Sequence, residues 1–321
     1  MATDGIEITL DAVIVAVTDE SPRLLTIDGP AGLPALPSGL LAPHDATLEI
    51  GLRRWVNEQT GLDVGYVEQL YTFGDRARGK EDGEGSLDGP RNLSIAYLAL
   101  VREGLPSAGA SWQNFYDFFP WEDHRAGRPA EFDTILPALD EFVAHDPGGE
   151  ERAQRVKIEL GHPGGPFDGL RVLERYELLY EAGLVFEAST VDPDPVGSTA
   201  PGGAPGAASD RAMSRPMHLD HRRIAATALG RLRGKLSYRP LVFELLSERF
   251  TLLQLQRVVE ALAGARLHKQ NFRRLVDAGG LVEGTGEQAR TGGRPAELFR
   301  FRREVLGERP RPGFGTPRIR A

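Results

Sequence analysis

Residues 266–280 read RLHKQNFRRLVDAGG, and this stretch decides the fold of the carboxy-terminal part of the chain. Its apolar side chains recur at the spacing of one helical stripe and belong to Phe272, Leu275 and Val276. Because successive residues of a helix are turned by about 100°, Gln270 and Arg274 point away from that stripe. The stretch predicts a short amphipathic helix over 267–278. Its polar face is either an ordinary solvated surface or a surface that reads another molecule.

The residues on either side extend this helix into a larger motif. Upstream, Thr251 and Gln254 have the spacing of a capping box at the start of a helix that ends near Gly264. Downstream, residues 281–283 and 296–301 are predicted strands around a glycine-rich tip, which is the pattern of a β-hairpin. Two helices joined by a short turn and followed by a hairpin indicate a winged helix-turn-helix domain.

The charge of the chain is divided between its two parts. Residues 1–215 carry 17 Lys and Arg against 36 Asp and Glu, whereas residues 216–321 carry 21 against 10. The formal net charge of −8 therefore conceals a basic end of +11 on an acidic body. A basic end favours a polyanionic partner, and with the helix-turn-helix pattern it predicts DNA binding. RNA is less favoured because the predicted strands carry no aromatic platform for stacking bases.

The predicted DNA contacts lie on the polar face of the helix over 267–278, at the preceding cap and at the hairpin tip. Arg, Gln and Asn side chains can contact base edges in pairs of hydrogen bonds, and Lys and Arg can bind phosphates. The predicted contacts are Thr251, His268, Lys269, Gln270, Asn271, Arg273, Arg274, Arg290 and Arg294. Helices and a hairpin also serve in protein–protein contacts, so an adaptor with a basic surface remains an alternative.

The amino-terminal part has the pattern of a mixed α/β body. The predicted strands are 6–17, 23–27, 62–73 and 92–102, with a further core strand in the aromatic-rich segment 112–121. The strand 92–102 is apolar on both sides and is therefore predicted to be central. Predicted helices cover 46–60, 133–145 with Asp133 as its cap, 173–183 before a short strand at 184–186, 218–236 with Asp220 as its cap, and 240–246.

Composition narrows the class of protein. The chain has no cysteine, which excludes disulfides, thiolate metal sites and a cysteine nucleophile. Its start lacks the pattern of a signal peptide, and no run of 18 apolar residues occurs, so we expect a cytoplasmic protein without a membrane span. The predicted domains are a sensor domain (1–148), its helical extension (149–189), a flexible linker (190–216), a winged helix (217–304) and a disordered tail (305–321).

The stretch 39–62 resembles the Nudix box, the loop–helix–loop of Nudix hydrolases. In that family, carboxylates on one face of the helix hold Mg²⁺ on a pyrophosphate. Aligned on Gly61, the matching face of this chain carries Trp55, Glu58 and Gln59. Arg54 matches the family's arginine, and its upstream glutamate falls on Ala46. One carboxylate beside an indole and an amide is a poor Mg²⁺ site, so we predict a Nudix-like fold with no metal and no catalytic residue.

Together, the two parts resemble the NrtR family, the Nudix-related transcriptional regulators of NAD metabolism. The resemblance rests on QLYTFGD (69–75), RNLSIAY (91–97), RLRGKLSYRP (231–240), FTL (250–252), LHKQNFRR (267–274) and GRPAELFRF (293–301). Members are dimeric repressors of NAD synthesis and salvage genes. Their Nudix-like domain senses ADP-ribose or a related nucleotide, and binding of the nucleotide releases the operator DNA.

The resemblance implies an α/β Nudix-like sandwich followed by a carboxy-terminal winged helix-turn-helix domain. It further implies a homodimer that binds operator DNA, with a nucleotide effector and no cofactor. The expected contacts to that nucleotide are Arg23, Arg54, Glu58, Gln59, Gln69, Tyr71 and Phe73, since arginines offset phosphate charge. Two alternatives remain: a Nudix-like domain that is only a structural platform, and an active Mg²⁺-dependent pyrophosphatase acting on ADP-ribose-like substrates.

Overall fold

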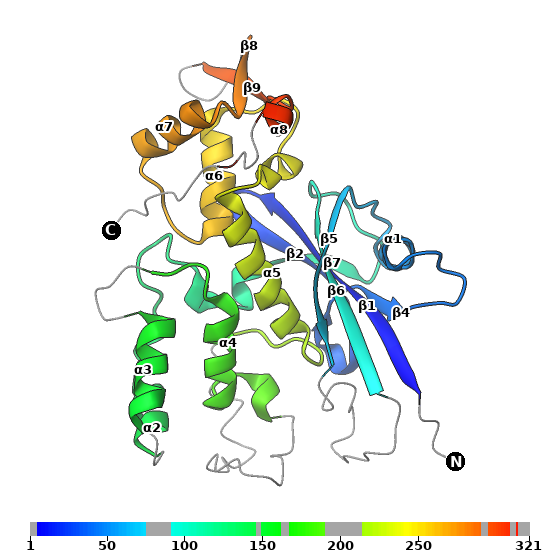
Figure 1. The fold of residues 1–321 in the computed structure, drawn as a ribbon, viewed down its shortest axis with the longest axis vertical. Coiled ribbons are helices and arrows are strands. Elements are labelled where there is room, and N and C mark those ends of the chain that lie inside the picture. Colours follow the sequence, from blue (N-terminus) through cyan, green and yellow to red (C-terminus); the bar gives the residue numbers. More distant parts are fainter. Residues whose placement is uncertain are drawn as a thin grey trace.

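The amino-terminal part of the chain is built around one mixed sheet (Figure 1). The computed structural model describes residues 5–74, 91–145, 149–161, 167–189, 214–289, 295–308 and 313. The strands of the sheet are β1 (Ile6–Thr18), β2 (Ser21–Asp28), β3 (Pro34–Ala35), β4 (Ser38–Leu40), β5 (Tyr66–Phe73), β6 (Arg91–Leu100) and β7 (Ala110–Asn114). The four strands predicted between residues 6 and 102 correspond to β1, β2, β5 and β6.

Helices cover the sheet and build most of the remaining chain. The α-helices are α1 (Leu48–Thr60), α2 (Phe132–Ala144), α3 (Gly149–Leu160), α4 (Val172–Glu181), α5 (His221–Leu236), α6 (Leu252–Ala263), α7 (Lys269–Gly279) and α8 (Val305–Glu308). Turns of 3-10 helix are η1 (Pro30–Gly32), η2 (Phe115–Asp117), η3 (Pro120–Glu122), η4 (Phe186–Ser189) and η5 (Leu241–Leu245). A separate hairpin consists of β8 (Val282–Ala289) and β9 (Ala296–Phe301).

Strands β1 and β6 form the centre of the sheet, with β2 and β5 on either side of them. β1 and β6 run parallel to each other and pair from Ile6 opposite Arg91 to Val15 opposite Leu100. β1 is buried throughout Leu10–Ala16, because both of its faces are covered. The prediction that the strand over 92–102 is central is confirmed.

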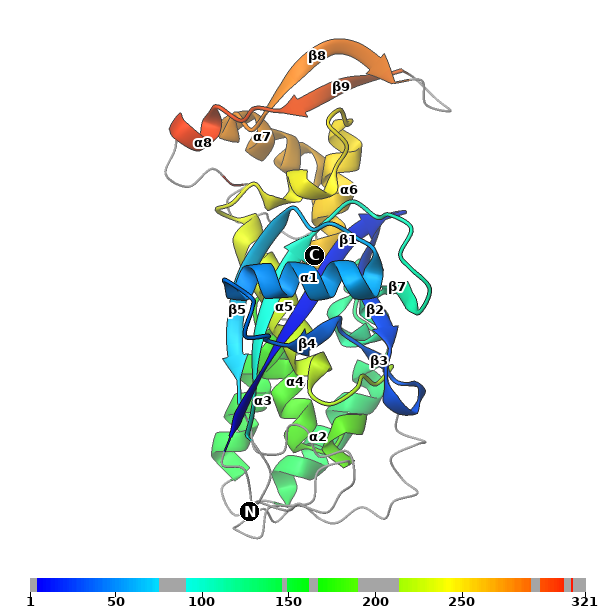
Figure 2. The same ribbon diagram turned by 90° about the vertical axis from the view of Figure 1, so that its right-hand side faces the viewer.

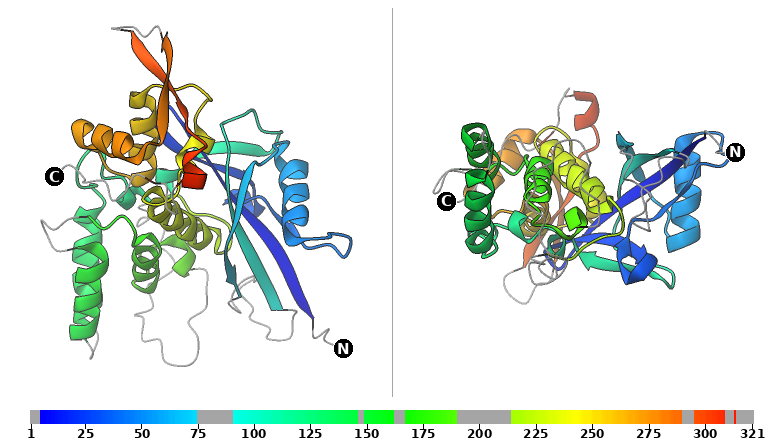
Figure 3. Two further views of the ribbon diagram at one scale, coloured as in Figure 1. Left: turned by 45° about the horizontal axis from the view of Figure 1, so that its top comes forward. Right: turned by 90° about the horizontal axis from the view of Figure 1, so that it is seen from below.

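The sheet is the middle layer of a sandwich (Figure 2). On one face, Leu10 and Ile14 of β1 share a core with Leu52 of α1. On the other face, Val13 and Val15 belong to a larger core that includes α4 and α5. Seen from below, α2 and α3 lie beyond α4 and α5, on the side away from the sheet (Figure 3). The predicted Nudix-like sandwich is confirmed.

Helix α5 joins the two parts of the chain. Its buried Ile224 and Leu229 lie in the same core as Val13 of the sheet and Val258 of α6. Helices α6 and α7 and the hairpin β8–β9 form the winged helix-turn-helix, at the top of Figure 1. The predicted divisions after residues 148, 189, 216 and 304 remain predictions, and the main core runs through α4, α5 and α6 without a break.

Several local predictions for the amino-terminal part are wrong. Residues 184–186 form no strand; the chain instead enters the 3-10 turn η4. Asp133 lies inside the first turn of α2 and does not cap it. The aromatic segment 112–121 is a strand only as far as Asn114, after which η2 and η3 bury its rings. Helix α3 lies in the predicted helical extension at 149–189, but its bounds were not predicted because its sequence is polar on most sides.

The two segments predicted to lack structure have different outcomes. Residues 190–213 of the predicted linker lie outside the described residues. The tail predicted to be disordered from residue 305 begins instead with helix α8, where Val305 is fully buried. Gly313 also packs closely on the end of α5, because an added Cβ there would lie 2.4 Å from the carbonyl oxygen of Ser237.

Candidate nucleic-acid interface and sensor face

Helix α7 is held on the winged helix by its apolar edge. Phe272 and Val276 are 1% and 0% exposed, as the stripe in the sequence predicts. The preceding helix α6 begins with the predicted capping box, in which Thr251 and Gln254 bond each other's backbone amides. It ends at Gly264, whose φ of 67° allows the sharp turn into α7. Helix α7 is thereby fixed in position with its other side exposed.

The exposed side of α7 carries the predicted polar side chains. His268, Lys269, Gln270, Arg273 and Arg274 are exposed, and Asn271 is half-buried. Arg274 Nη2 donates to Asn271 Oδ1 at 2.9 Å. Among the residues that the structure describes, Lys269, Gln270 and Arg273 have no side-chain hydrogen bond or ion pair. These groups are therefore available for base edges and phosphates.

Three of the predicted DNA contacts belong neither to α7 nor to its cap. Thr251 is 7% exposed, and its hydroxyl accepts from the amide of Gln254 at 3.2 Å. The structure thus makes Thr251 a buried helix cap, and its contact with DNA remains a prediction. Arg290 and Arg294 lie outside the described residues.

The hairpin β8–β9 is fixed to the start of α6 and takes the place of a wing. The backbones of Phe250 and Phe299 exchange two hydrogen bonds of 3.0 and 2.8 Å. Phe301 of β9 also stacks on Phe243 of η5, with 4.3 Å between the ring centroids. These contacts hold the hairpin beside the two helices.

The face of α1 that carries Trp55, Glu58 and Gln59 contacts β4. The indole of Trp55 donates to the carbonyl oxygen of Leu40 at 2.8 Å, and it lies flat against Gly39, where an added Cβ would be 2.1 Å from the ring. The amide of Gln59 bonds both the N–H and the carbonyl oxygen of Ser38, at 2.9 and 2.8 Å. Of the three side chains, only that of Glu58 is exposed, at 51%.

Arg54, the predicted phosphate contact on α1, already has partners within the chain. Its guanidinium bonds both carboxylate oxygens of Asp45, at 3.1 and 2.9 Å, and lies 3.6 Å from Glu58. These hydrogen bonds, with one from the amide of Ala42, lower the pKa of Asp45 to about 2. A charge paired in this way is poorly placed to offset a ligand phosphate.

The sheet separates the predicted nucleotide contacts. Gln69 lies opposite Tyr97 and Arg23 lies opposite Ala16, and both of these partners belong to the core beneath α1. An irregularity between Gln69 and Tyr71 shifts the register, so that Tyr71 lies opposite Ala96, on the other face.

Phe73 follows Tyr71 on that second face, where it is 7% exposed and part of the main core. Tyr71 is 64% exposed, and the two rings meet edge to face at 5.5 Å. The face of the sheet that α1 covers, together with α1 itself, is here called the α1 face. It carries Arg23, Arg54, Glu58, Gln59 and Gln69. Tyr71 and Phe73 do not belong to it. The expected set of seven contacts does not form one site.

A buried ionic cluster between the two parts of the chain was missed from the sequence. Glu122 of η3 is fully buried and binds Arg175 of α4 and Arg233 of α5, which are themselves 1% and 6% exposed. Arg233 also donates to the carbonyl oxygen of Leu262 in α6 at 3.1 Å. The residues are 53 and 111 positions apart from Glu122, so no local pattern relates them.

Two further kinds of feature are absent from the residues that the structure describes. Among the described residues, no three His, Asp or Glu side chains lie close enough together to hold a metal ion. Within the same residues, no helix is both long enough and apolar enough to cross a membrane.

The carboxy-terminal part of the chain matches a known domain family. Residues 242–301 match the family described as the NrtR DNA-binding winged helix domain. The chain is also 36% identical over 92 residues to the ADPR responsive transcriptional repressor NtrR of Acinetobacter baylyi. This match covers 29% of the chain and 37% of the relative, so the chain spans little more than a third of the relative's length.

Solved structures show the same fold over nearly the whole chain. The crystal structure of Shewanella oneidensis NrtR complexed with a 27mer DNA has a TM-score of 0.54 at 20% identity, covering 94% of this chain and 95% of that one. A second crystal structure of Shewanella oneidensis NrtR has a TM-score of 0.53 at 21% identity, covering 93% and 95%. The order of the sandwich and the winged helix is therefore shared with these proteins.

Proposed function

We propose that this chain, whose winged helix is that of the NrtR family, is a transcriptional repressor of NAD synthesis and salvage genes. The observation that carries the proposal is the exposed face of α7, where basic and amide side chains remain unpaired within the described residues. Family and fold agree with the resemblance found in the sequence. DNA is the partner that this face suits, because its side chains can reach both base edges and phosphates.

ADP-ribose, or a related nucleotide derived from NAD, is the proposed effector. The relative from Acinetobacter baylyi is described as responsive to ADPR, which supports this class of ligand. The α1 face is the proposed place of binding, with Arg23, Glu58 and Gln69 as contacts. Arg54 and Gln59 support this face through Asp45 and Ser38 instead of contacting the ligand.

We infer that the chain does not hydrolyse this nucleotide. A Mg²⁺ site needs several oxygen ligands, and the three-residue face of Trp55, Glu58 and Gln59 offers one carboxylate, Glu58, beside an indole and an amide that are already bonded to β4. The residues present therefore do not fit a Nudix metal site. The alternative pyrophosphatase predicts Mg²⁺-dependent release of AMP from ADP-ribose, and turnover that Glu58→Gln abolished would establish it in place of this inference.

The proposed repressor is a cytoplasmic homodimer in which each chain reads one half of an operator. Helix-turn-helix proteins bind DNA as dimers whose recognition helices enter successive major grooves. The proposed division is a sensor at 1–148, its extension at 149–189, a linker at 190–216 and the winged helix at 217–304. Sedimentation of the full chain, alone and with DNA, measures the proposed stoichiometry.

A gel-shift titration tests the proposed function. The DNA is a fragment from upstream of an NAD synthesis gene of the same genome, with an unrelated fragment of equal length as the control. We expect tighter binding to the upstream fragment, a steep loss of affinity with salt because several phosphates are contacted, and release by ADP-ribose. NAD and nicotinamide mononucleotide are titrated in parallel to identify the effector.

The possible failures of this experiment have separate meanings. Salt-independent binding, or none, would indicate the protein adaptor. Specific binding that none of the nucleotides changes would remove the sensor while leaving the DNA-binding role intact.

A further inference from the structure

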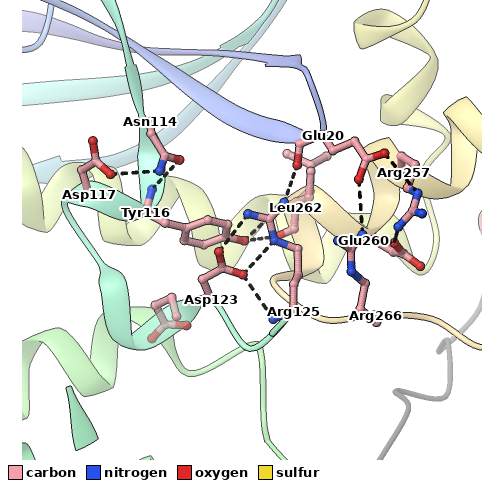
Figure 4. Close-up of polar contacts among 12 residues, drawn as sticks. Glu20, Asn114, Tyr116, Asp117, Asp123, Arg125, Arg257, Glu260, Leu262 and Arg266 are labelled. Carbon is pink, nitrogen blue, oxygen red and sulfur yellow. Dashed lines mark hydrogen bonds and ion pairs between the residues drawn. The ribbon is translucent and has the colours of Figure 1, made fainter. Parts of the chain in front are cut away.

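The turn between β1 and β2 extends from the sensor sheet to the helix-turn-helix (Figure 4). The Glu20 carboxylate lies 3.3 Å from Arg257 of α6 and 3.5 Å from Arg266, which precedes α7. Both arginines also bind Glu260 of α6, at 3.1 and 2.7 Å. Glu260 in turn accepts the backbone N–H of Leu267 at 3.0 Å. One chain of charged contacts thus connects the sensor sheet to the start of the recognition helix.

The backbone of this turn is strained in order to present Glu20. Asp19 and Glu20 have φ values of 49° and 59°, although neither is glycine. They form a two-residue turn between Thr18 and Ser21, and such turns normally use glycine or asparagine because both central residues need positive φ. A glycine at position 20 would relieve the strain but would remove the carboxylate. Strain retained at a charged contact between two domains points to a role for that contact.

A second group of contacts holds the turn of the helix-turn-helix against the sensor. Tyr116 of η2 donates to the carbonyl oxygen of Ala261 at 2.7 Å, and the backbone N–H of His124 donates to that of Gly264 at 2.7 Å. An added Cβ at Gly264 would lie 2.3 Å from the carbonyl oxygen of Glu122. The last carbonyl groups of a helix have no partner inside it. Here the sensor satisfies part of that need for α6.

Strand β1 leads directly from the proposed effector face to this turn. Its Leu10 and Ile14 pack in the core beneath α1, and the strand continues without a break to Thr18. A change in the position of α1 on β1 therefore has a short covalent route to Glu20. The contacts described above connect the sensor and the helix-turn-helix directly, and none of them involves residues 190–213.

We propose that Glu20 positions the helix-turn-helix and carries the ligand state of the α1 face to α7. This inference rests on the proposed function, since it names the route of that regulation. By linkage, the ligand and DNA must change each other's affinity by the same factor when they favour different arrangements of this contact. Removing the Glu20 carboxylate should therefore uncouple the two sites without removing either.

The test compares Glu20→Gln with Asp19→Asn. Both variants remove one negative charge from the same turn, but Asp19 forms no ion pair with any residue that the structure describes. The measured quantity is the ratio of operator dissociation constants with and without ADP-ribose. We expect Glu20→Gln to lower this ratio toward one, by about fivefold or more given the usual size of allosteric coupling. Asp19→Asn should keep the wild-type ratio, and an unchanged ratio in Glu20→Gln would overturn the proposal.

Hydrogen exchange provides a readout that needs neither DNA nor ligand. The amide of Leu267 should exchange faster in full-length Glu20→Gln than in Asp19→Asn, because Arg257 and Arg266 lose one of their partners and both of them hold Glu260, the acceptor of that amide. Equal exchange in the two variants would contradict the positioning role even if the repressor function itself had failed. Glu20→Gly separates strain from charge: it relaxes the turn, yet it should uncouple ADP-ribose as Glu20→Gln does.

Discussion

Helices α1 and α7 follow similar local rules and yet use their polar side chains in opposite ways. Both are short, both bury one apolar edge, and both end at a glycine with positive φ, Gly61 in one and Gly280 in the other. On α1, arginine and glutamine side chains bind Asp45 and Ser38 of the same chain. On α7, the bond between Asn271 and Arg274 is the one side-chain hydrogen bond of the outward face among the described residues.

The difference shows that residue type alone does not identify a functional surface. Arginine, glutamine and asparagine suit DNA and nucleotide phosphates, but they suit internal carboxylates and carbonyl groups equally well. What separates the two helices is whether the folded chain has already supplied a partner. The polar face of α1 should therefore affect the stability of the fold, and that of α7 should affect the affinity for a partner.

The largest expected effect belongs to the buried edge of α7. Phe272→Ala empties a fully buried site in the core of the winged helix and should lower the free energy of unfolding by about 3–5 kcal/mol. Calorimetric unfolding of the full chain measures this loss. Arg273→Ala, one residue along on the exposed side, is the control and should leave stability within about 0.5 kcal/mol. Comparable losses in both variants would mean that the two sides of α7 do not differ as described.

Arg274→Ala should have the next largest effect, and it should act on binding alone. Loss of a guanidinium that reads a base edge is expected to weaken specific DNA binding by about 1–3 kcal/mol. Binding to unrelated DNA should fall much less, and thermal stability should not change because Arg274 is exposed. Gel shifts on both fragments decide the role: an equal loss on both would make Arg274 a phosphate contact.

Gln59→Ala should produce the reverse pattern on α1. It leaves the backbone N–H and carbonyl oxygen of Ser38 without their partners and should destabilise the chain by about 1–2 kcal/mol. Unfolding in urea measures that loss, and affinity for the operator without ligand should stay at the wild-type value. Asn57→Ala is a matched control, since Asn57 is an exposed amide on the same helix. A Gln59→Ala variant of normal stability would contradict the internal role given to this face.

The sequence predicted those features that depend on neighbours along the chain. The stripe of α7, the capping box at Thr251 and the buried central strand β6 all follow from local spacing, and all are present. The grouping of Gln69 with Tyr71 and Phe73 failed because one irregularity in β5 moves side chains to the opposite face of the sheet. Simple alternation along a strand does not reveal such a shift.

The internal partners could not be predicted for a different reason. Gln59 binds Ser38 across a 21-residue separation, and Arg233 binds Glu122 across 111 residues. From its residue type alone, each of these side chains could equally face solvent or bind a ligand. Only the folded structure shows the internal partner that it binds. The location of a ligand site on α1 remains a prediction, whereas the internal partners of Arg54 and Gln59 required the structure.

A pH effect arises at the junction between the two regions and touches neither polar face. His124 stacks on Phe167 at 3.8 Å, and its Nε2 is buried with no hydrogen-bond partner among the described residues. Burial lowers the pKa of His124 from 6.5 to about 4; Glu122 opposes this shift, while Arg175 and Arg233 add to it. The unfolded chain therefore binds more protons than the folded chain between these two pH values.

The sign of the stability change follows from that difference in proton binding. The free energy of unfolding should fall as pH decreases from 6.5 toward 4, and this contribution should be absent above 6.5. His124→Phe keeps a ring against Phe167 and has nothing to protonate, so its unfolding in urea should depend less on pH in that window. His145→Gln, at an exposed histidine, should follow the wild type. If both variants followed the wild type, the acid response in this window would not come from the junction that holds α7 against the sensor.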